Sequence, residues 1–401
     1  MEIRPIFASL RKHRIPSLLI VLEIALACAV LCNALFLIGQ RIADIRWPNG
    51  IDQPNLSVVT VNGADPKLAA SDIPANLAAL RGIAGVAAVA AVTSMPLDQS
   101  ANLSDFTATP AGRPTVNSSL YLLGSGAPQV LGLRLLRGRF FNADEYGDGG
   151  FKEGLPTSHV VLVTQSDAQR LWPDKDALGQ TLYSGSQSWT VIGVVADVLA
   201  MDPTVSGPGG RDSSLFFPSR PNPSMGDYVL RSAPQDRDRV LREAEQMLGR
   251  LSPGAVVDGQ TYTQMRTAYF ATASSMVWML VLVCVVMLAV TAFGIVGLTS
   301  FWVGQRRRQI GIRRAVGATR GHILNYFQTE NFLLSSAGVV AGMALAFGIN
   351  LYLMSHYATG RMPWYYLPVS AIALWLLGQL AVLGPALRAA NVPPVVATRS
   401  V

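Results

Sequence analysis

The sequence predicts an α-helical membrane protein with four transmembrane helices and a large two-lobed α+β extracytoplasmic domain inserted between helices 1 and 2. Half of the 401 residues are hydrophobic and only 14% are charged, against about 25% in soluble domains. Four long apolar stretches occur, one early and three late in the chain. About 20 such residues cross a hydrocarbon core of about 30 Å, so each stretch is long enough to span a membrane.

The N-terminal residues 1–14 predict a cytoplasmic helix that lies on the membrane surface. Ile3, Ile6, Phe7 and Leu10 share one face, whereas basic residues occupy the others. This pattern suits an interfacial helix in contact with membrane lipids.

The first transmembrane helix is expected within 15–40, near 15–38, where Glu23 is the only charged residue. The segment is too long for a removable signal peptide and lacks a small-residue cleavage site. Because a charge in a span costs about 2.5 to 3.5 kcal/mol, Glu23 is interpreted as a buried or protonated carboxyl bonded to a neighbouring helix, with proton-coupled work as the alternative.

Residues 41–270 lack a comparable apolar run and predict a mixed α and β domain. Leu56–Val61 and Trp189–Val195 have the residue types and alternation of strands, and 234–251 has the apolar spacing of an amphipathic helix. The predicted order is strand, helix, strand, insertion, strand, helix, strand. It indicates a split α+β module that carries a second lobe at about 97–222.

The C-terminal region, 271–401, is expected to hold transmembrane helices 2–4 at about 272–303, 326–354 and 365–387, with a loop at 304–321. Gly338, Gly342 and Ala346 recur at four-residue spacing, so another helix can approach closely there, either from the same subunit or from a dimer partner. Asn33 on the first helix is able to hydrogen-bond across an interface.

The basic residues predict the orientation. Six arginines lie between helices 2 and 3 and four basic residues precede helix 1, whereas residues 41–270 carry a net charge of −3 within a total of +7. Since short cytoplasmic loops retain positive charge, both termini are expected in the cytoplasm and the large domain outside. The basic balance is therefore a topology signal, and no basic face with interleaved aromatics indicates nucleic-acid binding.

No motif for catalysis, metal binding or cofactor binding is present. None of the four lysines follows a glycine, so the sequence has no P-loop for nucleotide phosphates. The signatures H-E-x-x-H and G-x-S-x-G are also absent. Cys28 and Cys32 share a helix face without accompanying histidines, and are interpreted as packing residues. The chain is therefore not expected to be an enzyme.

The loop 304–321 predicts a short basic helix with an apolar side formed by Ile312, Ala315 and Val316. Gly317 is able to end this helix and Thr319 to cap the next one. Two interpretations remain open at this level: the arginines hold the loop at anionic headgroups, or the helix inserts into a cleft of a cytosolic partner.

This loop resembles the MacB/FtsX-like, or type VII, ABC transporter permeases. Their loop reads approximately E-R-x-x-E-I-G-I-R-[KR]-A-[LV]-G-A-[ST], and residues 305–319 match it in register. Further matches lie in the large domain and in the tail. They are Arg137–Phe141, Val160–Val163, Ala168–Trp172, Leu178–Gln180, Val191–Val195 and Pro385–Pro394.

The resemblance implies a permease subunit that couples ATP hydrolysis to movements of a MacB-like periplasmic core, driving export or extraction of a substrate. ATP and Mg²⁺ would be bound by a separate cytosolic ABC ATPase. Further partners would be a second permease copy or paralogue and, in some members, a periplasmic adaptor and an outer-membrane channel. The expected location is the bacterial inner membrane. The ATPase-coupling residues carried over are Gln309, Ile310, Gly311, Ile312, Arg313, Arg314, Gly317 and Ala318.

Two departures qualify this resemblance, and the lesser one is Ala397-Thr398-Arg399 in place of a common A-L-R terminus. Gln305 and Gln309 stand where the family usually has glutamates, which replaces a charge-assisted contact with a neutral one and raises the alternative of one half of a heterodimeric permease. An FtsX-like regulator, or a signalling receptor that controls a periplasmic partner without transport, is the alternative function.

Overall fold

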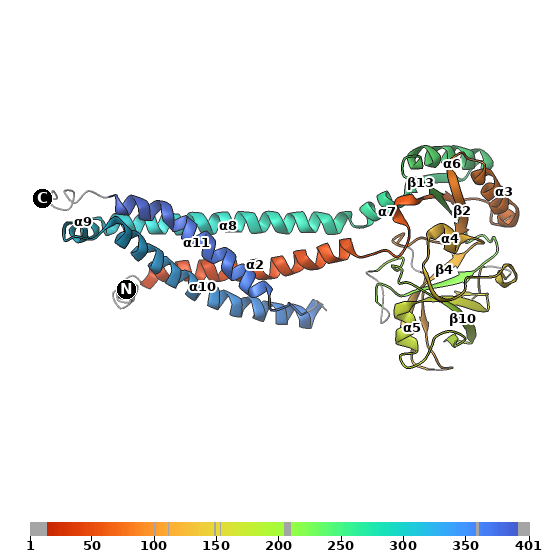
Figure 1. Cartoon of the computed structure of the whole chain (residues 1–401), viewed down its shortest axis with the longest axis horizontal. Helices are drawn as coiled ribbons and strands as arrows, with labels where there is room; N and C mark the ends of the chain where they lie inside the picture. Colours follow the sequence, from red (N-terminus) through yellow and green to blue (C-terminus); the bar gives the residue numbers. More distant parts are fainter. Residues whose placement is uncertain are drawn as a thin grey trace. The chain divides into compact units, whose positions relative to one another are not determined.

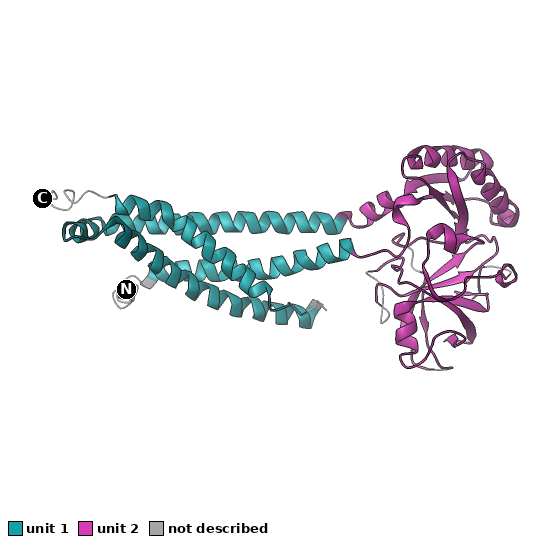
Figure 2. Cartoon of the chain, viewed as in Figure 1, with its two compact units in different colours: residues 1–46, 272–401 teal, residues 47–271 magenta. Residues whose placement is uncertain are grey.

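The computed structural model describes residues 14–99, 102–110, 112–147, 150–152, 154–203, 210–357 and 361–391. The chain divides into two compact units, 1–46 with 272–401 and 47–271 (Figure 2). They are called here the helical unit and the α+β unit. The expected surface helix falls on 1–13, and the end of the tail match on 392–394, outside the described residues.

Within the described residues, four helices are long and apolar enough to cross a membrane. They are α2 (Arg14–Arg46), α8 (Ala271–Gln305), α10 (Arg320–Tyr357) and α11 (Tyr366–Ala390), and the short α9 (Arg307–Ala315) lies between α8 and α10. The first and third extend beyond the expected 15–38 and 326–354. In both helices the helical backbone continues into polar residues beyond the apolar stretch. At the end of α2, the side chains of two such residues, Arg41 and Asp44, form an ion pair at 3.6 Å.

Glu330 is a second acidic residue inside an expected span, 326–354, in addition to Glu23 of the first helix. Glu330 lies well inside α10 and is 2% exposed. A second carboxylate is therefore buried in the helical unit.

The helical unit is built around α10, which packs along both α2 and α11. Small or apolar side chains of these helices form one continuous core, which includes Ile24, Cys28, Val339 and Val382. On α8 a single stripe is buried, whereas large apolar side chains such as Phe293 are exposed. The stripe consists of Cys284, Thr291, Ile295, Thr299 and Trp302.

In the α+β unit, described strands join into one sheet in the order β13-β1-β12-β2-β4-β11-β8-β10-β5, with β3 on β4 and β9 on β10. The strands are β1 (Leu56–Asn62), β2 (Val86–Val92), β3 (Leu103–Phe106), β4 (Val116–Leu123), β5 (Leu135–Gly138), β8 (Val160–Thr164), β9 (Thr181–Ser184), β10 (Gln187–Val195), β11 (Ser214–Pro218), β12 (Asp227–Ser232) and β13 (Val256–Thr261). A separate pair is formed by β6 (Phe151–Lys152) and β7 (Leu155–Pro156).

The sheet has two parts that meet through one residue pair, Val92 with Leu123. The first part, β13-β1-β12-β2, is antiparallel and packs against α3 (Ala69–Arg81) and α6 (Arg237–Leu251), which contact each other (Figure 1). The second part contains parallel pairs, β4 with β11 and β8 with β10, and packs against α5 (Gln165–Leu171). Strands β3 to β11 all lie in the segment expected to form the second lobe.

The core of the second part is centred on Trp189, which is 1% exposed. Its ring meets Phe106 and Phe217 edge-on, with centroids 5.7 and 5.6 Å away. Two further helices, α4 (Ala127–Leu131) and α7 (Tyr262–Tyr269), complete the unit. The turns η1 (Gln53–Asn55), η2 (Pro66–Leu68) and η3 (Ala143–Glu145) are 3₁₀-helical.

Candidate coupling site in the helical unit

The short helix α9 has definite local signals at both ends. The Ile310 N–H donates to the Arg306 carbonyl at 2.9 Å, which starts the helix. At the other end Gly317 has φ +108, and the N–H groups of Gly317 and Ala318 donate back to Arg314 and Arg313. This is a Schellman ending, which favours glycine because of its left-handed backbone. The helix is therefore a discrete element rather than an extension of α8.

The next helix has its own cap. The His322 N–H donates to the Thr319 hydroxyl at 3.2 Å, an N-terminal cap for α10. The turn between α9 and α10 is thus short and defined on both sides, which places the two helices next to each other.

One side of α9 is buried in the helical unit. Ile310 is 6% exposed and belongs to the same core cluster as Ile323 and Phe327 of α10. A cavity of about 210 Å³ lies beside this contact. Its lining comes from both helices and the turn, and consists of Arg306, Gln309, Ile310, Arg313, Ala318, His322, Ile323, Tyr326 and Phe327.

The other side of α9 is open and combines apolar with cationic groups. Ile312 is 51% exposed and Val316, directly after the helix, is 84% exposed, and Arg307 and Arg308 are exposed beside them. Exposed aliphatic side chains next to arginines can enter an apolar cleft rimmed by carboxylates.

The residues carried over from the family resemblance differ in their exposure. Ile310 and Gly311 are buried, Arg314 and Ala318 are half-buried, and Gln309, Ile312, Arg313 and Gly317 are exposed. The motif therefore supplies both the attachment of α9 and its open surface.

A buried ion pair that the sequence analysis did not find joins the start of α9 to α10. The Arg306 Nη1 atom lies 3.2 Å from each carboxylate oxygen of Glu330. The two side chains are 13% and 2% exposed. The Arg306 guanidinium also lies over the ring of Trp302, 5.8 Å from its centroid. A glutamate next to an apolar stretch, after a loop full of arginines, was the available signal.

The glycines of α10 lie against α2. A Cβ atom on Gly338 would lie 2.7 Å from the Cβ atom of Ile24, and one on Gly342 2.5 Å from the Cβ atom of Cys28. Near Ala346 the Asn33 amide donates to the Ala346 carbonyl at 3.3 Å. The structure thus places the stripe Gly338, Gly342 and Ala346 in a contact within one subunit.

Glu23 occupies a different position on α2. The half-buried Glu23 carboxylate lies next to Gly294 of α8 and occupies the space that a Cβ atom on Gly294 would take. Within the described residues no hydrogen bond to this carboxylate is seen, so the expected bond to a neighbouring helix is absent. The physical reason is that glycine offers no side-chain donor, and the backbone N–H groups of α8 are used inside the helix.

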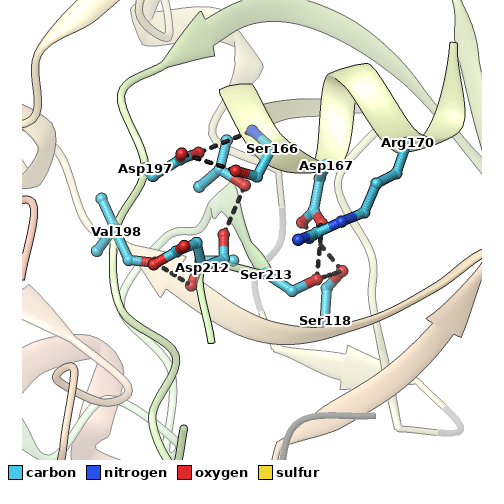
Figure 3. A network of polar contacts seen from close by, with 10 residues as sticks. Ser118, Ser166, Asp167, Arg170, Asp197, Val198, Asp212 and Ser213 are labelled. Carbon is cyan, nitrogen blue, oxygen red and sulfur yellow. Dashed lines mark hydrogen bonds and ion pairs between the residues drawn. The ribbon is translucent and has the colours of Figure 1, made fainter. Parts of the chain in front are cut away.

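The α+β unit contains a buried polar network (Figure 3). Asp167 of α5 is fully buried and accepts hydrogen bonds from Ser213 at 2.7 Å and Ser118 at 3.1 Å. Arg170 lies 3.5 Å from the same carboxylate. Burial raises the pKa of Asp167 to about 6, against the opposing effect of these partners. Figure 3 shows no histidine among its labelled residues, and we interpret the network as the attachment of α5 to the sheet.

A polar cavity of the α+β unit, about 630 Å³, lies between the ends of β1 and β12 and helix α3. Its wall carries the carboxylates of Asp65, Asp72, Asp98 and Asp227. Burial raises the pKa of Asp227 to about 6, although the Thr60 hydroxyl donates to it at 2.6 Å. Among the described residues no group of three or more histidines, cysteines or acids could hold a metal ion.

Two family models match the chain. The MacB-like periplasmic core domain matches residues 19–260, and the FtsX-like permease C-terminal domain matches residues 281–394. The first covers more than half of the chain and includes most of the α+β unit. The second includes α9, α10 and α11.

Curated relatives are named macrolide export ATP-binding/permease proteins MacB. The protein from Chromobacterium violaceum is 29% identical over 292 residues, which are 70% of this chain and 43% of the relative. The protein from Acinetobacter baylyi is 26% identical over 257 residues, 60% of this chain and 37% of the relative. The chain therefore spans about two fifths of the length of these relatives.

Two solved structures resemble part of the chain. The periplasmic region of MacB from Actinobacillus actinomycetemcomitans covers 57% of this chain and 97% of its own, with 17% identity and a TM-score of 0.38. The extracellular domain of the transporter YknZ from Gram-positive bacteria covers 49% and 94%, with 19% identity and a TM-score of 0.34. At these scores the family assignment rests on the two family models.

Proposed function

The chain belongs to the MacB/FtsX-like permease family, and from this premise we propose that it is the transmembrane subunit through which an ABC ATPase drives movements of the α+β unit. The movements would export a substrate, or extract it from the periplasm or the outer leaflet. The ATP and Mg²⁺ would be held by the ATPase, because this sequence has no P-loop lysine.

The observation that carries the proposal is the two-sided character of α9. The helix exposes Ile312 and Val316 next to arginines, although exposed aliphatic side chains gain nothing in water. At the same time, Ile310 and Arg306 attach it firmly to α10. A helix that is open on one side and fixed on the other suits contact with a partner that pushes on it.

The remaining features fit the same arrangement. We place α9 and both termini in the cytoplasm of a bacterial inner-membrane protein, because the basic residues gather there. A second permease copy or paralogue would cover part of the exposed apolar surface of α8. The names of the relatives contain macrolide export, and we extend to this chain the export activity alone.

Affinity purification of the full chain in mild detergent, followed by mass spectrometry of bound proteins, tests the docking. Replacing Val316 with Asp puts a carboxylate on the most exposed apolar side chain of this surface. Loss of a central apolar contact costs about 2 kcal/mol or more, so the recovered ATPase should fall by at least about tenfold.

A matched control is available in the α+β unit. Val256 is 68% exposed, and Val256→Asp should leave the recovered ATPase unchanged. Equal recovery with Val316→Asp and wild type would show that α9 is not the docking surface. Absence of any P-loop ATPase from the wild-type preparation would remove the transporter assignment itself.

A further inference from the structure

The contact between α9 and α10 consists of three attachments at helical spacing along α10. Arg306 pairs with Glu330, Ile310 packs in the cluster that holds Phe327, and the Arg313 guanidinium lies over the Tyr326 ring, 5.3 Å from its centroid. Residues three and four apart lie on one side of a helix. The short helix is therefore held along about one turn of α10 rather than at a single point.

Among the three, the ion pair is the attachment that resists separation most. Both charges are withdrawn from water, and breaking a buried ion pair is costly in a medium of low polarity. Pulling α9 away from α10 would expose that cost at once. Sliding an aliphatic side chain or a stacked guanidinium by a small distance costs much less.

From the ion pair, α10 continues into its close contact with α2. Glu330 is followed at four-residue intervals by Leu334, Gly338, Gly342 and Ala346. At Gly338 and Gly342 the two helices approach so closely that a methyl group would not fit. The last residue of α2, Arg46, is followed directly in the chain by the α+β unit.

The other connection to the α+β unit runs through α8, and it is packed differently. α8 buries one stripe of side chains, and its large apolar residues Trp278 and Phe293 are 74% and 75% exposed. A displacement applied to α9 is therefore passed on more firmly through α10 and α2 than through α8, although α8 directly precedes α9 in the chain.

We propose that the Arg306–Glu330 ion pair makes α9 and α10 move as one body, so that the force of the ATPase reaches the α+β unit through α10 and α2. Arg306 and Glu330 are thereby positioning residues that act through the helices they join. The inference rests on the proposed function, since it assumes that an ATPase docks on α9.

The experiment uses the full chain with its co-purified ATPase in lipid nanodiscs. The recovered ATPase measures docking. The ATP-dependent change in hydrogen–deuterium exchange over residues 47–271 measures the transmitted movement. The variants are Glu330→Gln, Arg306→Gln and the exchanged pair Arg306→Glu with Glu330→Arg. Arg388→Gln removes an exposed arginine near the end of α11 and serves as the control.

Both single variants should retain the ATPase within about twofold while the ATP-dependent exchange response falls about tenfold, because each removes one charge of the buried ion pair. The exchanged pair should recover the response to within about threefold, because it restores an ion pair at the same place. Arg388→Gln should match wild type. Arg306→Lys, which keeps the charge without the planar fork, should lie in between and replaces any variant that is lost from the membrane.

Four other outcomes would contradict the proposed role of the ion pair or the proposed function. A full response in Glu330→Gln would show that the ion pair does not carry the movement. Loss of the ATPase in the same variant would show that the pair shapes the docking surface instead. A wild-type complex that hydrolyses ATP without any exchange response in 47–271 would overturn the route as well. A wild-type chain that binds no ATPase would instead remove the proposed function.

Discussion

The close approach of α10 and α2 at Gly342 makes a quantitative prediction for a single methyl group. In Gly342→Ala the new Cβ atom would lie 2.5 Å from the Cβ atom of Cys28 and 2.6 Å from the carbonyl oxygen of Ala25. Neither atom is the end of a flexible side chain. Because ordinary contacts begin at about 3.4 Å, the two helices must separate by about 1 Å.

The expected cost follows from two opposing effects. Overpacking of a close contact destabilises by about 1–3 kcal/mol, whereas alanine in place of glycine favours a helix by about 1 kcal/mol. The net destabilisation of the helical unit should be about 0–2 kcal/mol. Gly348, on the same helix, has nothing within 4 Å of its Cβ position, so Gly348→Ala should stabilise by about 0.5–1 kcal/mol.

The assay can use a thiol at the contact itself. Cys28 is fully buried, and separation of the helices exposes it to a maleimide dye. In a thermal scan with such a dye, Gly342→Ala should label earlier than wild type and Gly348→Ala no earlier. If Gly342→Ala is as stable and as slowly labelled as Gly348→Ala, the packing of α10 on α2 is not as tight as the geometry requires.

Three further predictions concern the α+β unit. The pKa of the Asp227 carboxyl is about 6 in the folded state, against the usual 3.8, so the folded state binds a proton at this carboxyl more tightly than the unfolded state does. The resulting stabilisation of the folded state is present below pH 4 and is lost as the pH rises through 6, by up to about 3 kcal/mol. Asp227→Asn should remove this dependence, as hydrogen exchange of β12 between pH 4.5 and 7.5 would show; an unchanged profile contradicts the assignment. Trp189→Ala should destabilise the unit by about 3–5 kcal/mol, seen as a lower midpoint in urea, whereas a loss under about 1 kcal/mol would mean that the core closes around the gap. Thr261→Ala removes a cap in which the hydroxyl accepts from the Gln264 N–H at 3.1 Å, and should cost about 1 kcal/mol with faster exchange confined to α7; faster exchange throughout the unit would refute a local role.

Several sequence signals sufficed for elements whose order is local. Uninterrupted apolar runs require spanning helices wherever they occur, so the order of one helix, a large domain and three helices follows from composition along the chain. Glycine after a basic amphipathic segment indicated the end of α9, and the φ of Gly317 has the matching sign. The family resemblance of residues 305–319 was visible for the same reason, because these residues are contiguous.

Strands buried on both faces were harder to predict. Val116–Leu123 and Ser214–Pro218 form β4 and β11, which pair in the middle of the sheet. Their residues are almost all buried, so no alternation of polar and apolar positions marks them. Serines within them resemble loop residues in the sequence, and only the fold supplies partners for their hydroxyl groups, such as Asp167 of α5 for Ser118 and the Val198 carbonyl for Ser214.

The partners of individual side chains were decided by the tertiary structure alone. The sequence placed Gly338 and Gly342 at a spacing that admits another helix, but the identity of α2 as that helix depends on how the chain folds back over about 300 residues. In the same way, the sequence showed Glu330 at the edge of an apolar stretch but not the residue with which it pairs. Its burial against Arg306 arises because α10 begins earlier than its apolar stretch and carries the carboxylate beside α9. Composition and periodicity show which surfaces must pack against a partner. Which residues become partners depends on shapes and charges that come into contact only when the chain has folded.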